Sequence, residues 1–193
     1  MLPSNHIAFK EWAVVCASLA AGRQTIILRK GGIDEGREGF RVQHREFWLL
    51  PTRFHQDPSQ LTADGAALLR QMQSVQLPTD HFQIELYAAV EQVFEVRNLD
   101  VLHRLAGQHI LAEQTVDQRF HYRHPGLFVL AARIYRLPKP ITFADSPYIA
   151  GCKSWVELPT PMATDKLLPV LEEQTFQIQL HTTQRQLQSA DAE

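Results

Sequence analysis

The chain has 193 residues, of which 45% are hydrophobic and 21% charged, and its net charge at pH 7 is -2. That length fits one domain with a sizeable core, and the near-average composition excludes wholesale disorder. The near-neutral balance also excludes a protein that is basic all over and binds any polyanion by counterion release.

Charge is distributed unevenly along the chain. Residues 1–56 hold 8 Lys/Arg against 5 Asp/Glu, and residues 97–139 hold 7 against 3. Residues 57–96 hold 1 against 6, and residues 157–193 hold 2 against 6. If the two basic segments meet in the fold, they form a positive face on a neutral protein. The alternative is that these are ordinary solvated charges.

The first half of the chain predicts short strands and one helix. Residues 12–16 fit a strand or a helix, and Gly22 ends the helical turn that follows. The expected strands are rich in β-branched and aromatic residues and cover 24–29, 40–42 and 46–50. Further on, Asp57 as N-cap and Pro58 at the first helical position predict a helix to about Gln73.

A long strand and a helix follow. Residues 81–96 alternate in two different phases, which predicts a bulge or bend near Ala88. Asn98 then caps a helix that Gly107 ends. Residues 110–122 form a polar connection with some helical character.

The last third predicts a central strand, a short strand and a helical end. Residues 126–137 are strongly apolar, and we expect Pro138 and Pro140 to end this strand because proline removes ladder donors. Residues 153–158 predict a short strand, and residues 165–188 are helix-prone.

These elements define the expected fold class. The chain shows no regular βαβ alternation and no G-x-G-x-x-G motif, which disfavours a doubly wound nucleotide-binding sheet. We expect an α+β fold, with a small mixed, mostly antiparallel sheet or a partly closed barrel and helices packed on it. Residues 1–160 would form this single domain, and residues 161–193 a helical or partly disordered C-terminal tail.

Other classes are disfavoured. Cys16 and Cys152 lie in apolar surroundings without a C-x-x-C partner, so we expect neither a zinc site nor a disulfide scaffold. The nine histidines form no H-E-x-x-H frame, and we predict no metal and no cofactor. Residues 1–10 lack the pattern of a signal peptide, and no apolar run reaches the length of a membrane span. We therefore expect a cytoplasmic protein with no membrane contact.

Two stretches place polar residues at predicted strand ends. Arg29 and Lys30 open into Gly31-Gly32, which presents cations beside flexible backbone N–H groups and suits an anion such as phosphate. Thr52, His55 and Gln56 follow a buried-looking strand and offer groups that read base edges. His55 could also serve as a general base. The plain alternatives are a simple turn and a strand cap.

The third cluster contains the tryptophans. Trp155 follows Ser154 at a predicted strand start, where an indole can form a stacking platform for a base. Trp12 offers a second such surface. The alternative is that both indoles belong to the core, which is the more common place for tryptophan. Cys152 as a nucleophile would need a histidine nearby, which the sequence does not place.

Four separated motifs together resemble a bacterial family of domains of unknown function, family 1802 (DUF1802), over roughly residues 8–158. They are Lys10-Glu11-Trp12, Gly22-x-Gln24 with Arg29-Lys30-Gly31-Gly32, Phe47-Trp48-Leu49 with Pro51-Thr52 and His55-Gln56, and Gly151-Cys152-x-Ser154-Trp155. The resemblance implies no known activity. It suggests a loose association with restriction–modification systems.

A remoter likeness concerns the PUA-like superfamily. Gly22-x-Gln24-Thr25 leading to Arg29 is similar to the early G-x-K-x-x-E-x-R signature of its ASCH branch. The sequence departs from that signature at Gln24, where lysine is usual, and at Ile27 or Leu28, where the acidic residue would fall. The likeness implies a PUA-like fold and binding of RNA or modified bases, sometimes within enzymes.

Together these features predict a module that binds nucleic acid or a nucleotide-like ligand, with RNA, DNA or a modified base as partner. The site would comprise Trp12, Gln24, Arg29, Lys30, Arg41, Thr52, His55, Gln56, Ser154 and Trp155. The competing reading is a hydrolase or nuclease centred on His55. A third is a protein–protein accessory module that binds its partner through the acidic tail. The sequence assigns no catalytic residue.

Overall fold

The computed structural model describes residues 1–30, 35–36, 39–40, 44–53, 56–73, 81–144 and 153–188. Its main sheet has seven strands: β1 (Ser4–Trp12), β2 (Ile26–Arg29), β5 (Glu46–Thr52), β6 (His81–Val96), β7 (Leu127–Ala144), β8 (Trp155–Ala163) and β9 (Leu168–Pro169). A separate two-stranded hairpin contains β3 (Glu35–Gly36) and β4 (Gly39–Phe40).

The sheet order is β2-β7-β6-β5-β1-β8, with β9 paired to β7. All of these pairs are antiparallel except β1 with β5, which is parallel. The fold class predicted from the sequence, α+β with a mostly antiparallel sheet, is confirmed. In the described part of the chain, no backbone ladder closes the sheet into a barrel.

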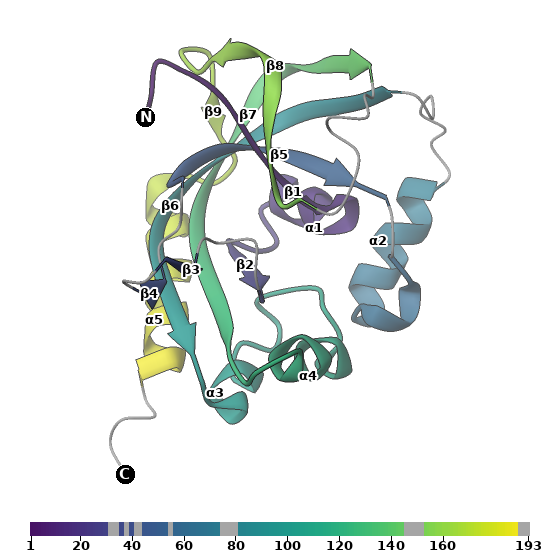
Figure 1. The fold of residues 1–193 in the computed structure, drawn as a ribbon, viewed down its shortest axis with the longest axis vertical. Helices are drawn as coiled ribbons and strands as arrows, with labels where there is room; N and C mark the ends of the chain where they lie inside the picture. Colours follow the sequence, from purple (N-terminus) through teal and green to yellow (C-terminus); the bar gives the residue numbers. More distant parts are fainter. Residues whose placement is uncertain are drawn as a thin grey trace.

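The helices are α1 (Ala13–Ala20), the 3-10 turn η1 (Pro58–Gln60), α2 (Ala63–Gln73), α3 (Leu99–His103), α4 (Glu113–His121) and α5 (Glu173–Gln188). In Figure 1, α3 and α4 lie at the lower end of the sheet, between the end of β6 and the start of β7. No helix among the described residues is long and apolar enough to cross a membrane.

Apolar residues of β5 serve two cores, because successive side chains of a strand point to opposite faces. Phe47 and Leu49 lie in the large core that the helices cover. Trp48 and Leu50 lie in a smaller core with residues of β6 and β8. Burial on both faces explains why residues 47–50 form a continuous apolar run in the sequence.

The C-terminal segment packs on this framework. β9 pairs with β7 at Tyr135 and Arg136, and α5 buries Phe176 and Leu180 in the large core. Burying an aromatic and a leucine side chain stabilises the fold by about 1.5–3 kcal/mol each. Helix α5 is therefore held by the same core as the rest of the chain.

Two sequence predictions need correction. Pro138 and Pro140 do not end the strand, because β7 continues to Ala144. Instead, the register shifts there: one residue of β6 lies opposite the four residues of β7 between Arg136 and Ile141. Because proline has no N–H, the hydrogen bonds between β6 and β7 are interrupted locally and then resume. Beyond the shift, β6 and β7 pair again, with residues 81–84 opposite residues 141–144.

The helix predicted from Asp57 is also interrupted. Asp57 caps only the short turn η1, with its side chain accepting from the Ser59 N–H. Leu61 then bridges to Leu111 before α2 begins. The bend predicted near Ala88 is confirmed as register shifts on either side of it, between Ile84 and Leu86 and between Val90 and Gln92.

Candidate functional site

A buried ion pair joins the ends of β1 and β2. Glu11, the penultimate residue of β1, has a side chain that is 1% exposed, and its Oε2 lies 3.4 Å from Nη1 of Arg29. Arg29 Nη2 donates to the Ser154 hydroxyl at 2.8 Å, and its guanidinium lies over the Phe9 ring at 4.5 Å. Arg29 thereby links edge strand β2 to the residue that precedes edge strand β8.

A second guanidinium approaches from α4. The Arg119 guanidinium lies over the Trp12 ring at 4.4 Å and donates to the carbonyl of Leu28 at 3.2 Å. Burial lowers the pKa of Arg119, and the charge of Glu11 opposes this shift. Glu11, Arg29, Arg119 and Trp12 are called the arginine cluster below. It holds two guanidinium groups against one carboxylate.

Two polar residues, the last residue of β5 and one shortly after it, are tied to the same strand ends. The Thr52 hydroxyl donates to the carbonyl of Glu11 at 3.1 Å. The carboxamide of Gln56 accepts from the Val14 N–H at 3.0 Å and donates to the carbonyl of Thr52. Gln56 therefore satisfies a free N–H in the first turn of α1, directly after Trp12.

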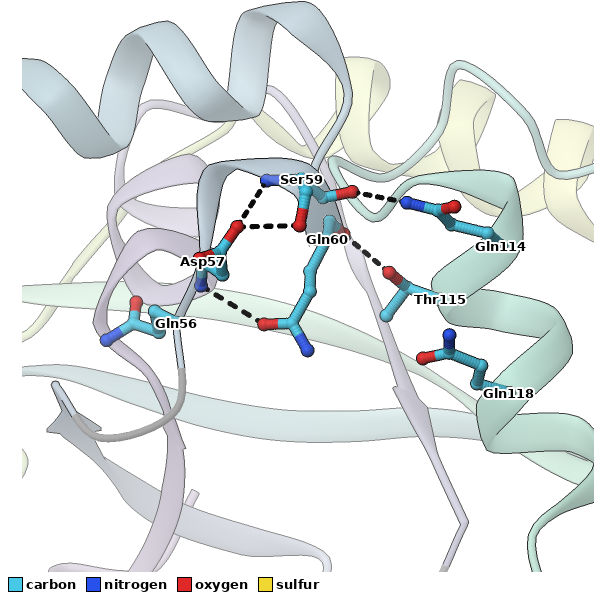
Figure 2. Close-up of a pocket in the computed structure, with 7 residues that line it drawn as sticks. All are labelled: Gln56, Asp57, Ser59, Gln60, Gln114, Thr115 and Gln118. Atoms are coloured by element: carbon cyan, nitrogen blue, oxygen red, sulfur yellow. Dashed lines mark hydrogen bonds between the residues drawn. The ribbon is translucent and has the colours of Figure 1, made fainter.

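A polar groove of about 490 Å³ begins at Gln56. We call it the glutamine groove; its lining is Gln56, Asp57, Ser59, Gln60, Gln114, Thr115 and Gln118, from the η1 region and α4 (Figure 2). Every lining side chain is polar. Four of the seven are glutamines, which offer both donors and acceptors.

Local hydrogen bonds fix the walls of the groove. Asp57 Oδ1 accepts from both the N–H and the hydroxyl of Ser59, and Gln60 Oε1 accepts from the Asp57 N–H. Across the groove, Gln114 Nε2 donates to the Ser59 carbonyl at 2.7 Å and Thr115 donates to the Gln60 carbonyl at 2.8 Å. These bonds join η1 to α4.

Other polar groups of the groove remain available. In the described part of the chain, the carboxamide of Gln118 makes no hydrogen bond, and Figure 2 shows it directed toward the side chain of Gln60 without a bond between them. Among the described residues, the side chain of Gln60 hydrogen-bonds only through Oε1, which leaves its Nε2 amide group without a partner there. One complete carboxamide and one free amide group therefore face the same space.

The structure brings six predicted site residues together. Trp12, Arg29 and Ser154 belong to or contact the arginine cluster, and Thr52 and Gln56 connect it to the groove. The sixth, Trp155, is half-buried against the rings of Phe9, Phe47 and His44, at 4.6, 5.0 and 5.1 Å between centroids.

Two predicted residues lie elsewhere. The Lys30 ammonium donates to backbone carbonyls in the last turn of α4 and just after it, including those of Phe120 and Gly126, so its charge stabilises the helix C-terminus. Gln24 is buried, and its Nε2 donates to the Ile26 carbonyl. Arg41 and His55 lie outside the described residues.

The two basic segments of the sequence do meet. Arg29 and Lys30 come from the first, and Arg119 and the carbonyls that Lys30 contacts come from the second. Sequence reasoning missed Arg119 and Gln118. The only signal was a polar stretch with helical character at 110–122, because nothing local shows which strand end a helix will face.

The family model described as "Domain of unknown function (DUF1802)" matches residues 8–182. The chain belongs to this family. The family membership expected from the sequence is thus confirmed, and the match extends beyond residue 158 into α5. No curated protein matches the chain.

Three solved structures resemble this DUF1802 chain. One is the crystal structure of ASCH from Zymomonas mobilis, at 12% identity and a TM-score of 0.44, covering 91% of this chain and 93% of that one. The others are two single-site mutants of the Zymomonas mobilis protein, each at 12% identity and a TM-score of 0.43. They cover 94% and 91% of this chain and 98% and 96% of theirs.

Proposed function

We propose that this chain binds a nucleic acid or a nucleotide-like ligand, with the base in the glutamine groove and the phosphate toward the arginine cluster. The observation that carries the proposal is the unbonded carboxamide of Gln118 facing the free amide of Gln60. Carboxamides pair with the donor and acceptor edges of bases.

Size and charge support the same ligand class. A groove of about 490 Å³ falls within the roughly 300–1,000 Å³ of small-ligand sites. Its polar lining favours a hydrogen-bonding ligand over an apolar one. The excess guanidinium of the arginine cluster favours an anionic group, and Gln118 is the neighbour of Arg119 in α4.

The test is fluorescence anisotropy of labelled single-stranded RNA and DNA and of plain and methylated duplex DNA, at low and physiological salt. The methylated probe is included because the family resemblance suggests a link with restriction–modification. We expect saturable binding that survives physiological salt. Gln118→Ala should weaken it by about 3- to 10-fold, the worth of one or two hydrogen bonds.

The matched control is Gln73→Ala, which removes an exposed carboxamide at the end of α2, outside the groove. It should leave the affinity unchanged. Binding that vanishes at physiological salt, or that both variants weaken equally, would remove the proposal. Cleavage of the probes that is lost in His55→Ala would instead establish the competing hydrolase.

A further inference from the structure

Helices α3 and α4 bring one imidazole and two carboxylates together. Nε2 of His103 lies 2.7 Å from Oδ1 of Asp117. One ligand atom each from His103, Glu113 and Asp117 lies within 4.8 Å of the other two. Glu113 and Asp117 are four residues apart in α4 and therefore share one helix face, adjacent to the face that carries Gln114 and Gln118.

All three residues stand on anchored elements. Asn98 caps α3 through a bond from the Asp100 N–H to its side chain at 2.9 Å, and α3 buries Val101 and Leu102. Helix α4 buries Val116 and Phe120 in the same core. Ligands held on packed helices keep their relative geometry, which is what a metal site requires.

We propose that His103, Glu113 and Asp117 bind a divalent transition-metal ion of the Zn²⁺ class. One imidazole nitrogen with two carboxylate oxygens suits Zn²⁺, Mn²⁺, Co²⁺ or Fe²⁺. Mg²⁺ and Ca²⁺ favour ligand sets made of oxygen alone. Three protein ligands leave at least one coordination position for water or a ligand oxygen.

The ion pair between His103 and Asp117 does not include Glu113, which stands in the first turn of α4. In the described part of the chain, Glu113 makes no hydrogen bond or ion pair, yet a carboxylate oxygen lies within 4.8 Å of the candidate ligand atoms of His103 and Asp117. Two carboxylates at positions i and i+4 of a helix repel each other. A bound divalent cation would reverse that repulsion by using both as ligands.

The test is calorimetric titration of Zn²⁺ into the full chain without nucleic acid, so its result is independent of the proposed ligand. We expect one site that Glu113→Gln weakens by about tenfold or more, as loss of even an outer-shell partner does. Because Glu113 is exposed and unbonded, this variant should fold as the wild type does, which circular dichroism checks.

Two further variants complete the test. His103→Ala should abolish Zn²⁺ binding at this site. When Co²⁺ is used as a spectroscopic substitute for Zn²⁺, the visible absorption bands seen with the wild type should be absent in this variant. His181→Ala, which removes an exposed histidine of α5, should change nothing. No Zn²⁺ binding by the wild type, or equal affinity for wild type and Glu113→Gln, would overturn the proposal.

Discussion

Helix α4 borders two polar regions of opposite character. In the arginine cluster, the Glu11 carboxylate, whose side chain is 1% exposed, pairs with the Arg29 guanidinium and accepts a hydrogen bond from the Trp12 N–H. In the glutamine groove, exposed Gln118 has no partner at all among the described residues. The first arrangement holds strand ends together. The second leaves hydrogen-bonding capacity for a ligand.

The two regions therefore make different contributions, one to stability and the other to ligand binding. A buried charge that loses its partner destabilises the fold strongly, whereas an exposed polar group is almost neutral for stability. Substitutions in the arginine cluster should therefore lower the free energy of unfolding. Substitutions in the groove should lower affinity and leave that free energy unchanged.

The largest effect is expected from Arg29→Met. The variant leaves the buried carboxylate of Glu11 without its ion-pair partner, so the free energy of unfolding should fall by about 3 kcal/mol. Urea unfolding measures it. The control is Arg97→Met, whose exposed pair with Glu95 is worth about 0.5 kcal/mol or less. Equal losses in both variants would contradict a special role for the cluster.

The next effect is a pH dependence beside the cluster. Burial, assisted by the charge of Arg119, lowers the pKa of His109 from 6.5 to about 4. The folded chain therefore binds fewer protons than the unfolded chain between these values. Stability is full above pH 6.5 and falls as the pH drops toward 4, by about 2–3 kcal/mol in total.

Replacing the histidine tests this directly. His109→Gln should flatten the stability profile from pH 6.5 to 4, whereas replacement of the exposed His181 should not. Urea midpoints measured at half-unit pH intervals give both profiles. An unchanged slope in His109→Gln would show that the neutral imidazole contributes nothing to the pH dependence.

The smallest effect on stability is expected in the groove. Gln118→Ala removes an exposed side chain with no partner, so the free energy of unfolding should change by about 0.5 kcal/mol or less. The same urea measurement gives the value. A loss comparable to that of Arg29→Met would mean that Gln118 has a structural role, and its effect on ligand binding would then lose its meaning.

The sequence determined much of this protein by itself. Local signals predicted three of the elements. They are the alternation at 81–96 for β6, the cap at Asn98 for α3 and the β-branched residues at 24–29 for β2. Four motifs in order indicated the family. The strand end predicted from Pro138 and Pro140 was wrong, because a strand can contain prolines where its register shifts. Such a shift can be recognised only when the partner strand is known.

Only the tertiary structure decided which polar residues meet. The sequence grouped Arg29, Lys30 and Gln24, whereas the fold sends them to an ion pair, a helix end and the core. Arg119 joined the cluster from about 90 residues away, and Gln118 came to face Gln60. Strand pairing and helix docking bring together residues distant in the chain, and that distance is what no local pattern records.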